Sequence, residues 1–119
     1  MEIKKIMVVG AEFMGSGIAQ VMAVAGYEVV LRDISDAFVA KGMGAIAKNL
    51  TGAVAKGKLS EAEKERITGR IKPTTELDPA KECDLIIEAI IENKQAKIGL
   101  LRELDGLCPS HTIFASNTS

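Results

Sequence analysis

Short apolar runs alternate with longer stretches of helical periodicity along the chain. Runs dominated by apolar residues are typical of buried strands, and they lie at residues 6–9, 27–31, 85–91 and 112–115, with a short further strand expected at residues 71–75. Between them, apolar side chains recur every three or four residues, which is typical of amphipathic helices, at residues 14–25, 35–56 and 93–105, and a further helix is expected at residues 60–70. This alternation predicts an α/β fold of the doubly wound Rossmann type, a mostly parallel sheet with helices on both faces.

Three local signals refine the expected elements. Pro73 lacks a backbone N–H, which places the third strand at an edge of the sheet. The run at residues 85–91 is nearly all apolar, as expected for a central parallel strand that is covered on both faces. Residues 60–63 read S-E-A-E, a capping box that begins a helix.

The two longest predicted helices carry more specific expectations. One face of the helix at residues 35–56 presents the apolar residues Val39, Met43, Ile46, Leu50 and Val54. Three glycines each weaken this helix by about 1 kcal/mol relative to alanine, so packing must hold it; they are Gly42, Gly44 and Gly52. In the last helix we expect three leucines to face the core and a glycine to end the helix, namely Leu100, Leu101, Leu104 and Gly106.

The first loop carries the candidate chemistry. It matches the first and third glycines of the dinucleotide-binding pattern G-x-G-x-x-G at Gly10 and Gly15, and the following helix end offers free N–H groups to a phosphate. Asp33 lies just past the end of the second strand, 23 residues after Gly10, where a carboxylate can bind both ribose hydroxyls of adenosine and favours NAD over NADP. Two structural interpretations stay open: Gly15 serves helix packing, and Asp33 is an acid near the helix start at Ser35.

Glu12 occupies the place of the middle glycine. That glycine normally allows the backbone to approach the pyrophosphate. A carboxylate about 4 Å from a phosphate costs roughly 1 to 4 kcal/mol, depending on the effective dielectric. We therefore expect a dinucleotide loop whose affinity for the cofactor is reduced by Glu12, with the bulky Phe13 beside it.

Composition narrows the class of protein. The 119 residues suit one domain, 47% of them are apolar and 26% charged, and the net charge is −1. The sequence has no basic stripe of the kind that nucleic-acid binders carry. No apolar run is long enough for a signal peptide or a membrane span. Cys83 and Cys108 lie 25 positions apart without paired histidines, so we expect reduced thiols, no metal site and a cytoplasmic protein.

Several motifs together resemble one family. They run in order along the chain as GAEFMGSGIAQ, GYEVVLRDI, KNL, KGKLS, IKPTTEL, DLIIEAIIEN and HTIFASNTS. The chain closely resembles the amino-terminal NAD domain of the 3-hydroxyacyl-CoA dehydrogenases, and most of all the 3-hydroxybutyryl-CoA dehydrogenases. The resemblance implies a domain over residues 1–119 and NAD as the cofactor. It also implies a complete enzyme that interconverts (S)-3-hydroxyacyl-CoA and 3-oxoacyl-CoA in fatty acid and butanoate metabolism.

The resemblance also implies roles for individual residues. The loop that holds the pyrophosphate corresponds to Gly10, Ala11, Glu12, Phe13, Met14 and Gly15. The nicotinamide side corresponds to Glu92, Lys97 and Asn117, and the positions that contact the CoA substrate correspond to Asn49, Lys56 and Ser119. Ser119 and Asn117 would lie at the reacting groups, with Ser119 donating a hydrogen bond to the reacting oxygen. Lys56 suits a phosphate, although a solvated lysine is the ordinary alternative.

The chain departs from the family at two points. The family has glycine where this chain has Glu12. Its catalytic histidine and carboxy-terminal helical dimerisation domain have no counterpart in these 119 residues, and the only histidine, His111, precedes the last strand and is expected to be a surface residue. Since oxidation of an alcohol needs a base for its proton, we expect this chain alone to be inactive and the complete enzyme to be a homodimer or larger. Two alternatives are a non-enzymatic Rossmann module with weakened or lost cofactor binding, and a related β-hydroxyacid dehydrogenase.

Overall fold

The computed structural model describes residues 2–90 and 94–116. The first half of the chain forms β1 (Lys5–Val9), α1 (Phe13–Val24), β2 (Glu28–Arg32), α2 (Asp36–Ala55) and α3 (Glu61–Gly69). The second half forms β3 (Ile71–Thr74), the 3-10 helix η1 (Asp78–Glu82), β4 (Leu85–Glu88), α4 (Lys94–Leu107) and β5 (Ile113–Ser116). Strands and helices alternate as the hydrophobic pattern predicts.

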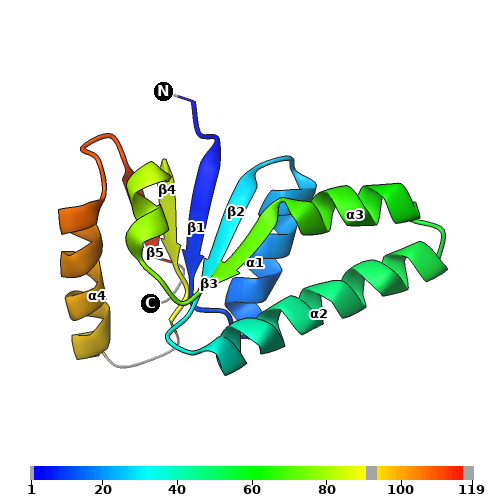
Figure 1. Cartoon of the computed structure of the whole chain (residues 1–119), viewed down its shortest axis with the longest axis horizontal. Coiled ribbons are helices and arrows are strands. Elements are labelled where there is room, and N and C mark those ends of the chain that lie inside the picture. The colour runs from blue at the N-terminus through cyan, green and yellow to red at the C-terminus, as the bar shows by residue number, and fades with distance from the viewer. Residues whose placement is uncertain (1, 91–93, 117–119) are drawn as a thin grey trace.

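Within the described residues, the strands form one parallel sheet in the order β3-β2-β1-β4-β5. Helices α1, α2 and α3 lie on one side of this sheet, and η1 and α4 lie on the other (Figure 1). The order reverses between β1 and β4, which is the place where doubly wound sheets bind their ligands. The predicted fold class is confirmed, including the edge position of β3 with Pro73.

Alternate side chains of the strands enter two separate cores. On β1, Ile6 and Val8 pack with α1, α2 and α3, whereas Met7 and Val9 pack with η1 and α4. Both pairs are fully buried. This two-sided burial explains why the central strands are continuously apolar rather than alternating.

Helices α2 and α3 form an antiparallel arm that extends beyond the sheet (Figure 1). The predicted capping box begins α3, because the Ser60 hydroxyl accepts from Glu63 N and the Glu63 carboxylate accepts from Ser60 N. On α2, Val39, Ile46 and Leu50 are buried as predicted. The apolar face of α2 thus packs towards the sheet, and the C-terminal part of α2 forms the arm together with α3.

Four details of the second half differ from the predictions. The strand β4 ends at Glu88, earlier than the predicted residue 91, which itself lies outside the described residues. Leu101 is 39% exposed rather than inward, and α4 continues through Gly106 to Leu107. The 3-10 helix η1 has no counterpart among the predicted elements.

The two cysteines, Cys83 and Cys108, lie beside η1. Both thiols are free, and each donates a hydrogen bond to a backbone carbonyl of η1.

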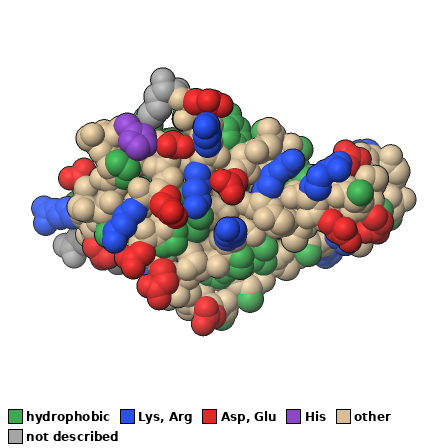
Figure 2. All heavy atoms as spheres, turned by 45° about the horizontal axis from the view of Figure 1, so that its top comes forward, with side chains coloured by type: hydrophobic (Ala, Val, Ile, Leu, Met, Phe, Trp, Pro, Cys, Tyr) green, Lys and Arg blue, Asp and Glu red, His purple; other side chains and the backbone are tan. Residues whose placement is uncertain are grey.

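Charges of both signs are interspersed on the face shown in Figure 2, and neither sign gathers into one stripe.

Beside β5, four large apolar side chains are partly exposed, namely Ile98, Leu101, Ile113 and Phe114. No helix among the described residues is long and apolar enough to cross a membrane. The other exposed large apolar side chains that the structure describes lie on α1 and around the start of α2, namely Met14, Val21, Val24, Ile34 and Phe38.

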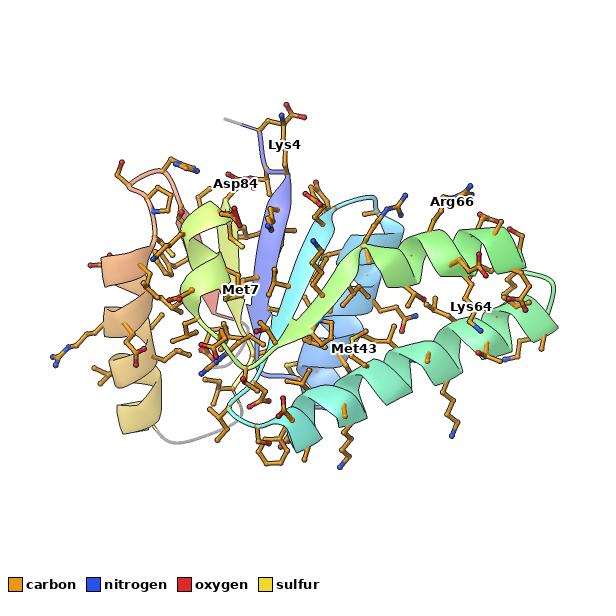
Figure 3. The ribbon with its side chains drawn as sticks, viewed as in Figure 1. Lys4, Met7, Met43, Lys64, Arg66 and Asp84 are labelled. Atoms are coloured by element: carbon orange, nitrogen blue, oxygen red, sulfur yellow. The ribbon has the colours of Figure 1, made fainter. Side chains whose placement is uncertain are left out.

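Asp84 joins the chain start to β4 at the amino edge of the sheet. Its Oδ2 accepts from Lys4 N at 2.9 Å and from Lys5 N at 3.2 Å, and its Oδ1 lies 3.1 Å from His111 Nε2. Figure 3 shows Lys4 and Asp84 together at this edge. The two backbone N–H groups, with a smaller contribution from His111, lower the pKa of Asp84 below its usual value.

We expect Asp84→Asn to lower the melting temperature at pH 7 and to matter little in acid. A carboxylate whose pKa is lowered by folding stabilises the fold above its unfolded-state pKa of about 3.9, and this contribution is lost as the pH falls through the folded-state pKa. Thermal unfolding followed by circular dichroism from pH 7 to pH 3 tests this. Glu65→Gln, an exposed substitution on α3, is the control; equal pH profiles for both variants would contradict the role of Asp84.

Candidate cofactor site

The glycine loop lies at the carboxyl edge of the sheet, beside the crevice between β1 and β4. Gly10 directly follows β1 and has a φ of +110°, a backbone conformation that favours glycine. Its N–H donates to Arg32 O at 2.8 Å, and a Cβ at this position would lie 2.9 Å from Ala89 O. Gly10 is therefore required both by the turn and by the close approach of the segment after β4.

The third glycine is required by packing. A Cβ on Gly15 would lie 1.6 Å from Gly10 O, so α1 reaches the loop only because Gly15 has no side chain. This confirms the structural interpretation of Gly15, and it leaves a cofactor role open because the same contact brings the start of α1 to the loop.

Gly42 supports the same loop from the next helix. A Cβ on Gly42 would lie 2.4 Å from Ala11 O and 3.2 Å from Ala11 Cβ. Gly42 therefore has a packing role that the sequence did not reveal, because it lets α2 cross directly over the glycine loop. Gly44 and Gly52 have open space around them.

Glu12 fits the loop without strain. It is the N-cap residue of α1, with φ of −72° and ψ of −172°, and its side chain makes no capping hydrogen bond. Its side chain is exposed. Any residue adopts this backbone conformation, so the fold itself does not need glycine here, and only a bound pyrophosphate would demand one.

Asp33 ties the end of β2 to the glycine loop. One carboxylate oxygen accepts from Ala11 N at 2.7 Å and the other from Ile34 N at 2.7 Å. Ser35 caps α2 instead, because its hydroxyl accepts from Phe38 N at 3.2 Å. The alternative that Asp33 serves the start of α2 is therefore wrong, and its carboxylate stands directly beside the loop.

A groove of about 620 Å³ separates α1 and α2. Its lining is mostly apolar and includes Met14, Ile18 and Val21 from α1 and Asn49 from α2. The Asn49 amide donates to Gln20 at 3.1 Å, and Lys56 follows at the exposed C-cap of α2. Of the three residues predicted to contact CoA, the structure thus places Asn49 on α2 at this groove and Lys56 directly after α2, whereas Ser119 lies outside the described residues.

Several predicted site residues lie beyond what the structure describes. Glu92, Asn117 and Ser119 lie outside the described residues, whereas Phe13 and Lys97 belong to α1 and α4. His111 is exposed, as predicted, and its contact with Asp84 places it at the amino edge. This is the opposite edge of the sheet from the glycine loop.

Sequence reasoning missed Glu88, the last residue of β4. Its side chain is 2% exposed, and its Oε2 accepts from Ile90 N at 2.5 Å. A charged residue within the apolar run at residues 85–91 is the signal that could have identified it. Among the described residues, no cluster of three potential metal ligands occurs.

The comparisons with known proteins agree with this geometry. The family model of the 3-hydroxyacyl-CoA dehydrogenase NAD binding domain matches residues 5–119. A probable 3-hydroxybutyryl-CoA dehydrogenase of Bacillus subtilis is 45% identical over 119 residues, which are 100% of this chain and 42% of that relative. The 3-hydroxybutyryl-CoA dehydrogenase of Clostridioides difficile is 40% identical over 115 residues, 97% of this chain and 41% of the relative.

Solved structures give the same result. The crystal structure of (S)-3-hydroxybutyryl-CoA dehydrogenase from Ralstonia eutropha superposes with a TM-score of 0.95 at 45% identity, over 99% of this chain and 42% of that one. The chain thus spans about two fifths of the length of these relatives. It belongs to the 3-hydroxyacyl-CoA dehydrogenase family and corresponds to the NAD-binding domain of that family.

Proposed function

We propose that this chain binds NAD across the crevice between β1 and β4, as the cofactor domain of an enzyme that interconverts (S)-3-hydroxyacyl-CoA and 3-oxoacyl-CoA. The observation that carries the proposal is the Asp33 carboxylate, which is held 2.7 Å from Ala11 N beside the glycine loop. A carboxylate at this point can accept hydrogen bonds from both ribose hydroxyls. The N-terminal N–H groups of α1 then face the pyrophosphate.

The rest of the chemistry follows from the placement of the cofactor. Bound NAD would accept a hydride from the 3-hydroxyl carbon of the substrate, and the hydroxyl proton needs a base. His111 cannot supply that base from the amino edge, where it contacts Asp84. We therefore expect the 119-residue chain to bind cofactor without oxidising substrate by itself.

The groove between α1 and α2 is an argument for an acyl-CoA as the substrate. Its apolar lining suits a flexible, largely apolar chain, Asn49 offers an amide at its rim, and the ammonium of Lys56 suits a phosphate. In this proposal the nicotinamide side is completed by Glu92, Lys97 and Asn117, and Ser119 reaches the reacting oxygen. Dimerisation of the complete enzyme, a cytoplasmic location and a role in fatty acid and butanoate metabolism belong to the same proposal.

The cofactor preference can be tested by calorimetric titration with NADH and NADPH. We expect one-to-one binding of NADH, with NADPH at least about tenfold weaker because the 2′-phosphate meets the Asp33 carboxylate. Asp33→Asn should remove most of this preference and weaken NADH about tenfold, as expected for the loss of hydrogen bonds to a charged group.

Asp36→Asn is the matched control, because Asp36 is an exposed acid three positions further, in the first turn of α2. It should change neither affinity. Absence of NADH binding both in this chain and in its Glu12→Gly variant would disprove the cofactor role, and would favour the alternative of a non-enzymatic Rossmann module.

The substrate class needs a separate test. A chimera in which this chain replaces the matching part of the Bacillus subtilis relative should oxidise NADH in the presence of acetoacetyl-CoA. A folded chimera that binds NADH but acts only on free hydroxy acids would support the related β-hydroxyacid dehydrogenases instead.

A further inference from the structure

The crevice between β1 and β4 has two walls, and the glycine loop forms only one of them. The other wall is the turn that follows β4. Ala89 N donates to Val9 O at 2.8 Å, and Ala89 O lies 2.9 Å from the position of a Cβ on Gly10. The backbone at residues 89–90 therefore lies against the first glycine of the cofactor loop.

Glu88 holds this turn. In the strand register it pairs with Val9 of β1 on one side and with Ser116 of β5 on the other. Its Oε2 accepts the N–H of Ile90, two residues further along. The carboxylate thus closes the turn through this hydrogen bond. The side chain of Ile90 packs against the core between the sheet and α4.

The burial of Glu88 is unusual for an acid. Among the described residues, Glu88 is the only buried acid, at 2% exposure. Aspartate and glutamate are almost never buried without partners, because desolvation penalises the charge. An apolar residue would suit the two-sided burial of β4 better, which makes Glu88 a candidate for a role at the crevice.

We propose that Glu88 is a positioning residue for the nicotinamide riboside half of the cofactor, because it holds the 88–90 turn that forms the β4 wall of the crevice. This inference rests on the proposed binding of NAD. Asp33 at the end of β2 receives the adenosine half, and a dinucleotide lies across the point where the strand order reverses. The portion beyond the pyrophosphate must then pass over the β4 side, where the turn lies.

The test compares two ligands that share the adenosine half. ADP reaches only the Asp33 side and the glycine loop, whereas NADH also crosses the β4 wall. In the Glu12→Gly background, Glu88→Leu should lower the affinity for NADH about tenfold, the value expected for one lost hydrogen bond to a charged group. It should change the affinity for ADP less than about threefold. Glu88→Gln keeps an acceptor for Ile90 N and should restore NADH binding to within about threefold.

Thr112→Val is the matched control for stability. Thr112 is also buried, and its hydroxyl donates to Cys83 O at 2.8 Å. Cys83 lies two residues before the first residue of β4, at the end of the strand opposite to Glu88. Thr112→Val should lower the melting temperature without changing the ratio of the NADH and ADP affinities. Amide hydrogen exchange measured by NMR should show faster exchange at Ile90 in Glu88→Leu and not in Thr112→Val.

The outcomes separate this inference from the proposed function. Failure of both NADH and ADP to bind the Glu12→Gly background would overturn the cofactor role itself. Binding of both ligands with an equal fall in Glu88→Leu, or with no fall, would overturn the positioning role of Glu88 and leave the cofactor role intact. A changed affinity ratio in Thr112→Val would also overturn it, because the effect would then follow general destabilisation.

Discussion

Glu12→Gly is expected to raise the affinity of the chain for NADH between about fivefold and nearly a thousandfold. A glutamate at the start of α1 places a negative charge where the pyrophosphate should lie, and two like charges about 4 Å apart repel each other by roughly 1 to 4 kcal/mol. The exposed side chain makes no capping hydrogen bond that its removal would break. Glycine is also an acceptable N-cap residue, within a few tenths of a kcal/mol of the best ones.

Two further measurements identify the cause of the effect. Glu12→Gln keeps the size of the side chain and removes its charge, so a gain that appears already with glutamine is electrostatic, and one that needs glycine is steric. The electrostatic part should shrink with added salt, because exposed charges are screened within about 10 Å at 0.1 M ionic strength. Equal NADH affinities for all three proteins in titration calorimetry would show that Glu12 points away from the cofactor.

The fold was predictable because its information is local. Most strands of the sheet are compact apolar runs, the more polar β3 being the exception, and the helix starts at Ser35 and Ser60 are encoded by capping residues within three positions. The 3-10 helix η1 was missed because five residues carry no periodicity. Leu101 was placed inward because the pattern does not reveal how narrow the buried stripe of α4 is, with Leu100 and Leu104 buried in the core and Leu107 packed against it.

The candidate site was predictable only where spacing encodes it. Gly10, Gly15 and Asp33 stand at distances that a strand, a turn and a helix impose. Gly42 could not be recognised, because its importance arises from contact with Ala11, 31 positions earlier, and only the crossing of α2 over the loop creates that contact. Glu88 shows the converse: its sequence signal was visible, but its meaning depends on a turn whose backbone lies against Gly10.

Gly15→Ala should destabilise the fold by about 3 kcal/mol or more, at the upper end of the cost of adding a methyl group to a packed interior. The added Cβ would lie 1.6 Å from Gly10 O, and neither atom belongs to a flexible side chain that could turn aside. The start of α1 or the glycine loop must move. For a domain of this size we expect a fall in melting temperature on the order of 10 °C, measured by calorimetry or circular dichroism.

Gly17→Ala is the matched control, because it lies two positions further on α1 and a Cβ there would have nothing within 4 Å. It should stabilise the chain by up to about 1 kcal/mol, since alanine favours a helix over glycine. A Gly15→Ala protein as stable as Gly17→Ala would show that α1 does not approach the loop this closely. If instead Gly15→Ala stays folded at low temperature, the displaced helix end should weaken NADH binding, because the groups that face the pyrophosphate have moved away from Asp33.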